Sequence, residues 1–343
     1  MLIDFFVIPL VKIVFILILI LTTVILLVYA ERRVSALIQG RYGPNRVGPF
    51  GLLQTVADVL KLILKEDVVP KAASKPFHSL APIISLTVAL VTLAVIPFGG
   101  NVYLFGKEIA LMVAPGVNIG VLYILAMSSL GVYGITLSGW ASNNKYSLLG
   151  GVRSTAQMIS YEIAMGLSII GVIMLSSTLQ LEEVVKMQAG WRWNIILQPI
   201  GFCVFLIAAF AETNRLPFDL PESESELVGG FHTEYSGLKF GMFFLAEYAN
   251  MITASALITT LYFGGYHIPY IELLELPQNV MGIINFIAFF GKMTLFLLFM
   301  IWVRWTLPRF RYDQLMNLGW KILIPLGLIN IFLTGFVLTF ILR

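Results

Sequence analysis

Three glutamates stand in or at the end of strongly apolar segments, where an ionisable side chain is costly and usually functional. Glu162 lies in AQMISYEIAMG and Glu247 in FFLAEYAN, each beside a tyrosine, and Glu212 closes a third apolar segment. Burial disfavours the charged form of a carboxylate, and a second carboxylate nearby disfavours it further. We therefore expect these side chains to exchange protons near neutral pH and to form a proton path. A Glu–Lys or Glu–Arg pair that fixes helix register is the structural alternative.

The third of these glutamates opens a segment rich in carboxylates, AETNRLPFDLPESESELVGGFHTEY, residues 211–235. Its carboxylates are Glu212, Asp219, Glu222, Glu224, Glu226 and Glu234, and its one arginine is Arg215. Runs of carboxylates are usually solvated, but two prolines and several apolar residues in this segment predict a loop that packs against something. We expect the loop to bind a protein partner.

A second polar segment, residues 30–78, begins with basic residues. Its Gly- and Pro-rich part, RYGPNRVGP, carries Arg41 and Arg46 and predicts an ordered turn rather than a helix. Arg32 and Arg41 bracket an ordered segment that lies beside the helix predicted next in the chain. Two arginines in such a place indicate a polar cavity. For Arg33, a positively charged membrane anchor is a better explanation than a place in this cavity.

An amphipathic helix is predicted directly after this turn, in GPFGLLQTVADVLKLILKED. Gln54, Asp58, Lys61 and Lys65 follow one another at spacings of 4, 3 and 4 residues, which places them on one stripe of a helix. Apolar residues cover the rest of its surface. Because the segment has too many charges to span a membrane and too much apolar surface to stay in water, we expect it to lie flat at the membrane interface.

Residues that bind redox cofactors are scarce. The only cysteine, Cys203, excludes a disulfide framework and an iron–sulfur cluster within the chain. The three histidines, His78, His232 and His267, fall at or beyond the ends of apolar segments and not in the facing pairs that hold haem. No glycine-rich phosphate loop follows a predicted strand. Any redox chemistry must therefore come from another polypeptide or a diffusible ligand.

Long apolar segments must position these residues. Hydrophobic residues make up 58% of the 343 residues and charged residues 12%, and the mean hydropathy is +0.89, which excludes a soluble globular domain. A helix needs about 20 apolar residues to cross ~30 Å of hydrocarbon. The segments long enough are 5–29, 79–97, 117–139, 154–176, 194–213, 239–262, 281–304 and 320–342. The sequence predicts an all-α polytopic membrane protein with about eight transmembrane helices and one interfacial helix, forming a single membrane domain, 1–343.

The positive charges predict how this domain is oriented. Most lysines and arginines fall in the loops after the first, third, fifth and seventh apolar segments. By the positive-inside rule, these loops face the cytoplasm or its equivalent, and both termini face outward. The inner loops 30–78 and 211–238 then lie on the same side of the membrane.

Five segments, in order along the chain, closely resemble one family. They are YAERRVSALIQGRYGPNRVGPFGLLQTVADVLKLILKED, GWASNNKYSLLGGVRSTAQMISYEIA, AETNRLPFDLPESESELVGGFHTEYSG, FFLAEY and TLPRFRYDQLM. They are similar to the H subunit of bacterial NADH–quinone oxidoreductase, whose mitochondrial counterpart is subunit 1 of respiratory complex I. The similarity runs from about Tyr29 to Lys321, and the chain ends fit by hydropathy only.

The resemblance implies roles for particular residues. It implies that the inner loops form the membrane part of a quinone chamber and a docking surface for partner subunits. The residues that would line the quinone chamber are Glu31, Arg32, Arg41, Arg46, Asp58, Arg153 and Arg215. The residues that would couple quinone reduction to proton translocation are Glu162, Glu212, Glu222, Glu224, Glu226 and Glu247.

The same resemblance implies cofactors and partners. The chain would hold no cofactor and no redox centre of its own, and quinone would be the substrate, while flavin and iron–sulfur clusters would sit in partner subunits. The expected partners are the quinone-site subunits of the peripheral arm on the inner face, antiporter-like and small membrane subunits, and membrane lipids, with no nucleic acid. A bacterial inner membrane is favoured over a mitochondrial one. The sequence leaves open whether the quinone is ubiquinone or menaquinone, and which donor supplies the electrons.

Three alternatives keep these residues and change the function. The equivalent subunit of a membrane-bound hydrogenase or a deazaflavin-dependent dehydrogenase would receive electrons from another donor. A stand-alone proton or cation carrier would use the same glutamates, but such carriers often show inverted repeats and broken helices, and the sequence shows no repeat. A purely structural scaffold would leave the buried carboxylates unexplained.

Overall fold

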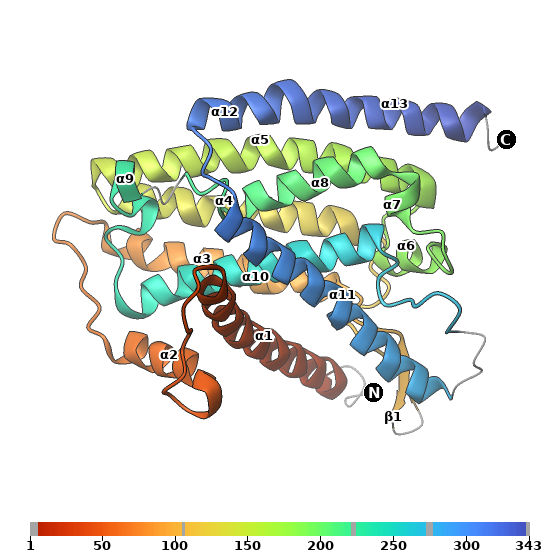
Figure 1. Cartoon of the computed structure of the whole chain (residues 1–343), viewed down its shortest axis with the longest axis horizontal. Coiled ribbons are helices and arrows are strands. Elements are labelled where there is room, and N and C mark those ends of the chain that lie inside the picture. The colour runs from red at the N-terminus through yellow and green to blue at the C-terminus, as the bar shows by residue number, and fades with distance from the viewer. Residues whose placement is uncertain (1–5, 105–106, 221–223, 272–276, 341–343) are drawn as a thin grey trace.

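Long apolar helices make up most of the protein (Figure 1). A computed structural model describes residues 6–104, 107–220, 224–271 and 277–340. Within these ranges, 7 helical segments are long and apolar enough to cross a membrane. They are α1 (Ile8–Ile38), α3 (Lys75–Thr92) with its continuation η3 (Leu93–Val95), α4 (Gly120–Ala141), α5 (Lys145–Ser176), α10 (Gly237–Tyr262), α11 (Gln278–Thr306), and the run of α12 (Tyr312–Asn317), η6 (Leu318–Leu323) and α13 (Ile324–Phe340). The predicted all-α polytopic membrane fold is confirmed.

The remaining elements are short. The helices and helical turns among them are η2 (Pro49–Gly51), α2 (Gln54–Leu64), α6 (Leu181–Met187), α7 (Asn194–Leu197), α8 (Pro199–Glu212), α9 (Glu224–Leu227) and η4 (Gly230–His232). Strand β1 (Asn101–Leu104) pairs antiparallel with β2 (Lys107–Ala110), with Asn101 opposite Ala110. This small hairpin lies in the loop between α3 with its continuation η3 and α4.

The fifth predicted span, 194–213, is shorter than a full membrane crossing. It is split into α7 and α8 at Gln198, whose φ of −132° and ψ of 53° are not helical, because the residue before a proline avoids the helical conformation. Helix α8 has 14 residues, which is about 21 Å at ~1.5 Å per residue and less than the ~30 Å of hydrocarbon. The predicted eight spans are therefore seven long helices and one short apolar helix within the described residues.

The helices form one bundle with α5 near its middle. Helix α5 packs against α4, α8 and α13, while α10 packs against α3 and α11. The close approach of α3 and α4 requires Gly134, where an added Cβ would lie 2.1 Å from Ser85 Oγ. Helices α1 and α11 run along one side of the bundle, and α2 stands at one end of it (Figure 1).

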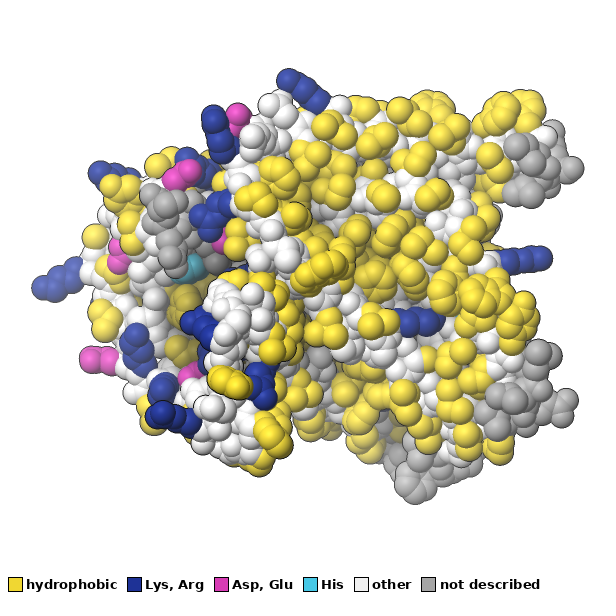
Figure 2. All heavy atoms as spheres, in the orientation of Figure 1, with side chains coloured by type: hydrophobic (Ala, Val, Ile, Leu, Met, Phe, Trp, Pro, Cys, Tyr) yellow, Lys and Arg dark blue, Asp and Glu magenta, His cyan; other side chains and the backbone are white. Residues whose placement is uncertain are grey.

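Large apolar side chains fill the interior and also cover the outside. Tyr161, Phe205, Tyr262 and Phe289 are fully buried. Many apolar side chains on α1 and α13 are exposed, and apolar side chains cover much of the face shown in Figure 2. Such a large apolar surface is stable only against lipid or another apolar protein surface, as a multi-pass membrane protein requires.

Charged side chains gather at one end of the bundle. That end carries α2, α9 and α12, whereas the start of α1 and the end of α13 lie toward the opposite end (Figures 1 and 2). The loops 30–78 and 211–238 are therefore at the same end of the molecule. Which side of the membrane this end faces stays a prediction from the positive-inside rule.

The predicted interfacial helix is present as α2. Its side chains Leu60, Ile63 and Leu64 are exposed. On its other side, Leu62 packs against Gly241 near the start of α10, with its Cδ1 3.2 Å from where a Cβ would lie. An apolar face that points away from the bundle, next to charged residues, suits a helix that lies in the membrane surface.

Candidate functional site

A buried ion cluster lies where α1, α10, α11 and the loop after α8 meet. Glu31 accepts hydrogen bonds from Arg215 Nη1 at 3.1 and 3.2 Å. It also accepts from Arg304 Nη1 at 2.5 Å and from the hydroxyl of Tyr248 at 2.6 Å. Through Nε, Arg215 forms an ion pair with Glu247. Only 4% of the Arg215 side chain and 8% of the Glu31 side chain are exposed, so water screens these charges little.

The charge of Arg215 is fixed by its neighbours. Burial alone would lower the pKa of this guanidinium, but the carboxylates of Glu247 and Glu31 raise the pKa above its ordinary value. The ring of Tyr248 adds a cation–π contact, with Arg215 Cζ 4.3 Å from the ring centroid. Arg215 therefore stays charged at physiological pH.

The motif FFLAEY on α10 supplies two members of the cluster. Consecutive residues on a helix point about 100° apart. Tyr248 can therefore reach Glu31 while Glu247 reaches Arg215 and lines a neighbouring cavity. The two side chains thus connect the ion cluster to the cavity.

The loop that carries Arg215 is held against α5 by Gln157. The buried amide of Gln157 donates hydrogen bonds to Ala211 O and Phe218 O, both at 2.8 Å. Between these two carbonyls, Asn214 has a φ of 51°, a left-handed conformation that asparagine adopts more readily than most residues. The turn at Asn214 points the next residue, Arg215, toward the ion cluster.

The motif TLPRFRYDQLM packs on the opposite side of this loop. Phe310 donates its backbone N–H to Pro217 O at 3.1 Å, and its ring stacks on Phe218 at a centroid distance of 5.3 Å. Arg309 pairs with Asp219 at 3.0 Å. The acidic-loop motif therefore contacts all four of the other motifs in the folded chain.

The predicted packing of the acidic loop is found within this chain. Phe218, Leu220, Leu227 and Phe231 are buried against other parts of the same protein, whereas Val228 is exposed. The buried apolar residues thus have an internal explanation, and they do not by themselves call for a protein partner. Docking of a partner at this loop stays a prediction.

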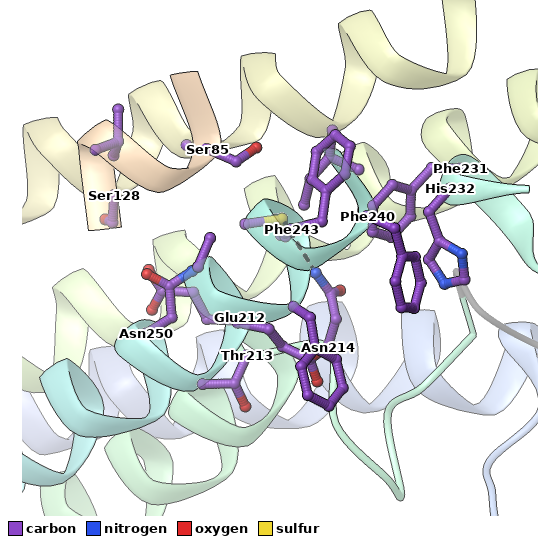
Figure 3. A pocket seen from close by; sticks show the side chains of 17 residues that line it. Ser85, Ser128, Glu212, Thr213, Asn214, Phe231, His232, Phe240, Phe243 and Asn250 are labelled. Carbon is purple, nitrogen blue, oxygen red and sulfur yellow. Dashed lines mark hydrogen bonds between the residues drawn. The ribbon is translucent and has the colours of Figure 1, made fainter. Parts of the chain in front are cut away.

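A cavity of about 220 Å³ borders the ion cluster at Glu247. Glu212, Ser128 and Asn250 line one part of it, and His232 together with phenylalanine rings lines another part (Figure 3). The cavity is large enough to hold several water molecules. Its hydroxyl, amide and carboxylate walls would give these waters hydrogen-bond partners.

Two carboxylates approach each other beside this cavity. The hydroxyl of Ser128 donates to Glu212, and Glu162 lies close enough to Glu212 to repel it. The hydroxyl of Ser129 donates to Glu162. Among the described residues, no lysine or arginine forms an ion pair with either carboxylate. A smaller cavity of about 30 Å³ shares Ser128 and Glu212 with the first and extends to Thr92.

Two ion pairs at the charged end join long helices to short ones. Arg32 on α1 pairs with Asp58 on α2 at 2.5 Å, and Gln54 donates to the same carboxylate at 3.1 Å. Arg153 on α5 pairs with Glu226 on α9 at 2.6 Å. All four charged side chains are partly exposed, so each pair contributes little stability by itself. Their effect is to hold charged groups in place at this end.

Four predicted site residues are not brought into these contacts. Arg41 and Arg46 are exposed. Glu222 lies outside the described residues, and for Glu224 the structure describes only the backbone, in α9. The roles predicted for these four residues therefore stay predictions.

Sequence reasoning misses several residues that the structure places here. They are Tyr248, Arg304, Ser128, Ser129 and Asn250. Arg304 stands at the end of an apolar segment, where an arginine fits a membrane anchor equally well. Serines inside apolar helices give no clear signal, because they also bond to their own helix backbone. The tyrosine beside an intramembrane glutamate is the one signal in the sequence that could have found its residue.

The family model described as NADH dehydrogenase matches residues 11–335, which include the ion cluster and both cavities. The chain belongs to this family. A relative from Cytophaga hutchinsonii, an H subunit of NADH-quinone oxidoreductase, is 57% identical over 307 residues, or 90% of each chain. A relative from Rhodothermus marinus, subunit 8 of NADH-quinone oxidoreductase, is 53% identical over 323 residues, or 91% of this chain and 92% of the other.

A third relative agrees with these two. An H subunit of NADH-quinone oxidoreductase from Geobacter metallireducens is 52% identical over 327 residues, which cover 95% of each chain. The family resemblance predicted from the five sequence motifs is therefore confirmed. The similarity to all three relatives extends over most of both chains and is not confined to the motifs.

Proposed function

We propose that this chain is the membrane subunit of an NADH:quinone oxidoreductase in a bacterial inner membrane, where it forms the membrane part of the quinone chamber and a glutamate path that couples quinone reduction to proton translocation. One observation carries this proposal. Arg215 is ion-paired with both Glu31 and Glu247, and Glu247 shares a cavity with Glu212. The chain thus connects charged groups of the first inner loop with carboxylates inside the bundle.

The charged end of α1 and helix α2 suit an amphipathic ligand. A quinone has a polar head group and a long apolar tail, and binding sites for such ligands combine apolar walls with a few placed polar groups. The exposed leucines of α2 offer apolar surface, and the pair of Arg32 and Asp58 offers polar groups beside it. Electrons would arrive from partner subunits that hold flavin and iron–sulfur clusters.

The glutamates inside the bundle suit proton transfer. Reduction of a quinone to a quinol consumes two electrons and two protons, so the charge beside the chamber changes in each turnover. Glu247 carries the Glu–Arg pair of the structural alternative, whereas Glu162 and Glu212 accept from serine hydroxyls. Waters in the cavity would link Glu247 to Glu212, and Glu212 passes the proton toward Glu162.

The substitution Glu212→Gln tests the path in the assembled complex. It keeps the size of the side chain and removes its ability to carry a proton, so we expect coupled quinone reduction and proton pumping to fall at least tenfold. Electron transfer from NADH to a water-soluble artificial acceptor should stay within twofold of the unaltered complex, because it does not pass through this subunit. The matched control is Glu183→Gln, which changes an exposed carboxylate paired with Lys186. Full coupled activity in the Glu212→Gln variant would remove this residue from the path.

A further inference from the structure

Helix α10 ends inside the protein, and its last carbonyl groups need hydrogen-bond partners. The chain turns sharply after the helix at Gly264 and Gly265, whose φ values are 69° and 54°. Gly265 N donates back to Thr259 O at 2.8 Å. The last four carbonyl groups of a helix have no partner within the helix, and in an apolar membrane environment an unsatisfied carbonyl is costly. The end of α10 therefore has to be closed by other parts of the chain.

Two buried amide side chains close part of this end. The amide of Gln188 donates to Thr260 O at 2.9 Å, and the amide of Asn194 donates to Leu261 O at 2.7 Å. The side-chain oxygen of Gln188 accepts from the backbone N–H of Gly264 at 3.0 Å. These groups come from the connection between α6 and α7, so that connection is attached to the end of α10.

Lys292 of α11 binds the turn that follows the end of α10 at Tyr262. Its ammonium group donates to three backbone carbonyls, Phe263 O at 2.8 Å, Gly265 O at 3.0 Å and His267 O at 2.7 Å. The face of the Trp193 ring lies beside it, with the Lys292 Nζ 4.9 Å from the centroid. Three donors meet three acceptors, so the hydrogen-bonding capacity of the ammonium group is used completely. The cation also faces the negative end of the helix dipole.

This contact joins α10 and α11 at a second level, far from the ion cluster. Arg304 lies twelve residues after Lys292 on α11, about 18 Å along the helix at ~1.5 Å per residue. Tyr248 lies fifteen residues before Phe263, the first of the three carbonyl residues, about 22 Å along α10 at ~1.5 Å per residue. Arg304 and Tyr248 then meet on the same carboxylate, Glu31. A slide of one helix along the other would have to break both contacts.

A role for Lys292 in proton transfer fits this geometry poorly. A proton carrier needs to release a proton to an acceptor and to take up another, and backbone carbonyls do neither. Lys292 also lines neither of the two cavities that Glu212 borders. The three carbonyls hold the Lys292 side chain in one place.

We propose that Lys292 is a positioning residue, whose tethered ammonium group sets the register of α10 against α11 and so holds Tyr248 and Arg304 on Glu31. The effect on quinone reduction rests on the proposed function, whereas the effect on register does not. The carbonyl oxygens and the tryptophan ring form a site for a small ammonium ion, which the chain fills with its own side chain. Shortening that side chain leaves a site of matching chemistry for a free alkylammonium ion.

The experiment compares Lys292→Ala and Lys292→Met in the purified, detergent-solubilised complex, with and without methylammonium. The alanine variant leaves space for methylammonium beside the carbonyls, whereas the methionine side chain fills that space without a charge. We expect both variants to raise the KM for a short-chain quinone at least fivefold and to lower the melting temperature. Methylammonium should restore both the KM and the melting temperature in the alanine variant. It should restore neither value in the methionine variant. Lys186→Ala, which removes an exposed lysine, is the control.

The outcomes separate this proposal from the proposed function. Restored melting without any change of quinone KM would keep the register role and count against the quinone chamber. Equal behaviour of the alanine and methionine variants, with no effect of methylammonium on melting, would overturn the role of Lys292. If neither variant assembles, the cells are grown with methylammonium. Assembly of the alanine variant alone then supports the proposal, and failure of both overturns it.

Discussion

Arg215 holds together two carboxylates, Glu31 and Glu247, that come from different helices. Bringing a charge out of water costs several kcal/mol per ion, and the mutual attraction offsets this cost only while every charge has its partner. Removal of one partner is therefore much more harmful than its net contribution to stability suggests. The arginine also cannot be neutralised by losing its proton, so the cluster depends on its presence at every pH.

Replacement of Arg215 by leucine should remove the guanidinium from Glu247 and leave Arg304 as the arginine paired with Glu31. We expect a loss of about 3–5 kcal/mol in stability, seen as a lower melting temperature and a lower yield of assembled complex. The control is Arg192→Leu, which makes the same change at an exposed position and should cost less than about 0.5 kcal/mol. A loss of under ~1 kcal/mol in the Arg215→Leu variant would mean that water already reaches this cluster.

The pairing of these residues lies beyond sequence reasoning. The sequence supplies the cost of an ionisable group in an apolar segment, and that is enough to select Glu162 and Glu247. It gives no measure of which arginine meets which glutamate, because Glu31 and Arg304 lie 273 residues apart along the chain. The contact forms only when α1 and α11 have packed together.

Helices and loops meet closely at glycines in this fold. Gly150 on α5 faces the η4 turn, where an added Cβ would lie 2.8 Å from both Gly230 Cα and Phe231 N. Both of those atoms belong to the backbone, which cannot move aside as a flexible side chain can. The η4 turn also supplies Phe231 and His232 to the wall of the cavity. The absence of a side chain at Gly150 therefore sets how near this wall lies.

Gly150→Ala should push the η4 turn away from α5. Overlap with packed backbone costs about 1–3 kcal/mol, and we expect lower thermal stability together with a lower rate of quinone reduction. Gly166→Ala is the control on the same helix, because an added Cβ there meets nothing within 4 Å. That change should be neutral or stabilise by up to about 1 kcal/mol, since alanine favours a helix. Equal stability in the two variants would contradict the close contact.

The elements are more predictable than their contacts. Length and hydropathy find all the long helices, because ~30 Å of hydrocarbon sets how many apolar residues each one needs. The break before Pro199 is also encoded locally, since proline restricts the residue before it. The β1–β2 hairpin carries no clear pattern in its four-residue strands. The internal packing of the acidic loop depends on distant partners such as Phe310, so its apolar residues alone could not tell an internal contact from an external one.

At the scale of the whole molecule, one end is charged, and the start of α1 and the end of α13 lie toward the other (Figures 1 and 2). Loops rich in lysine and arginine stay on the side of the membrane from which the protein is inserted. The sidedness of the proposed chamber follows from this distribution, because the loops 30–78 and 211–238 both lie at the charged end.

Single cysteines introduced into a Cys203→Ser background test this orientation. We expect Lys71→Cys to react with a membrane-impermeant maleimide only in inside-out vesicles, and Lys186→Cys only in right-side-out vesicles. Labelling is measured by the gain in mass of the purified subunit. The Cys203→Ser protein without an introduced cysteine is the control and should stay unlabelled. Labelling of both positions from the same side would contradict the arrangement of the bundle.

The ion cluster contains two guanidinium groups and two carboxylates, Arg215, Arg304, Glu31 and Glu247. Their formal charges sum to zero, so at a distance the group has almost no field. One proton added to either carboxylate would leave a net positive charge with little solvent around it. At an effective dielectric constant of ~20, such a charge stabilises an anion about 10 Å away by roughly 1.7 kcal/mol, more than a tenfold change in an equilibrium. With all four groups charged, the cluster would therefore have almost no field at a distance, and one added proton would make it a source of positive potential that reaches well beyond its own contacts.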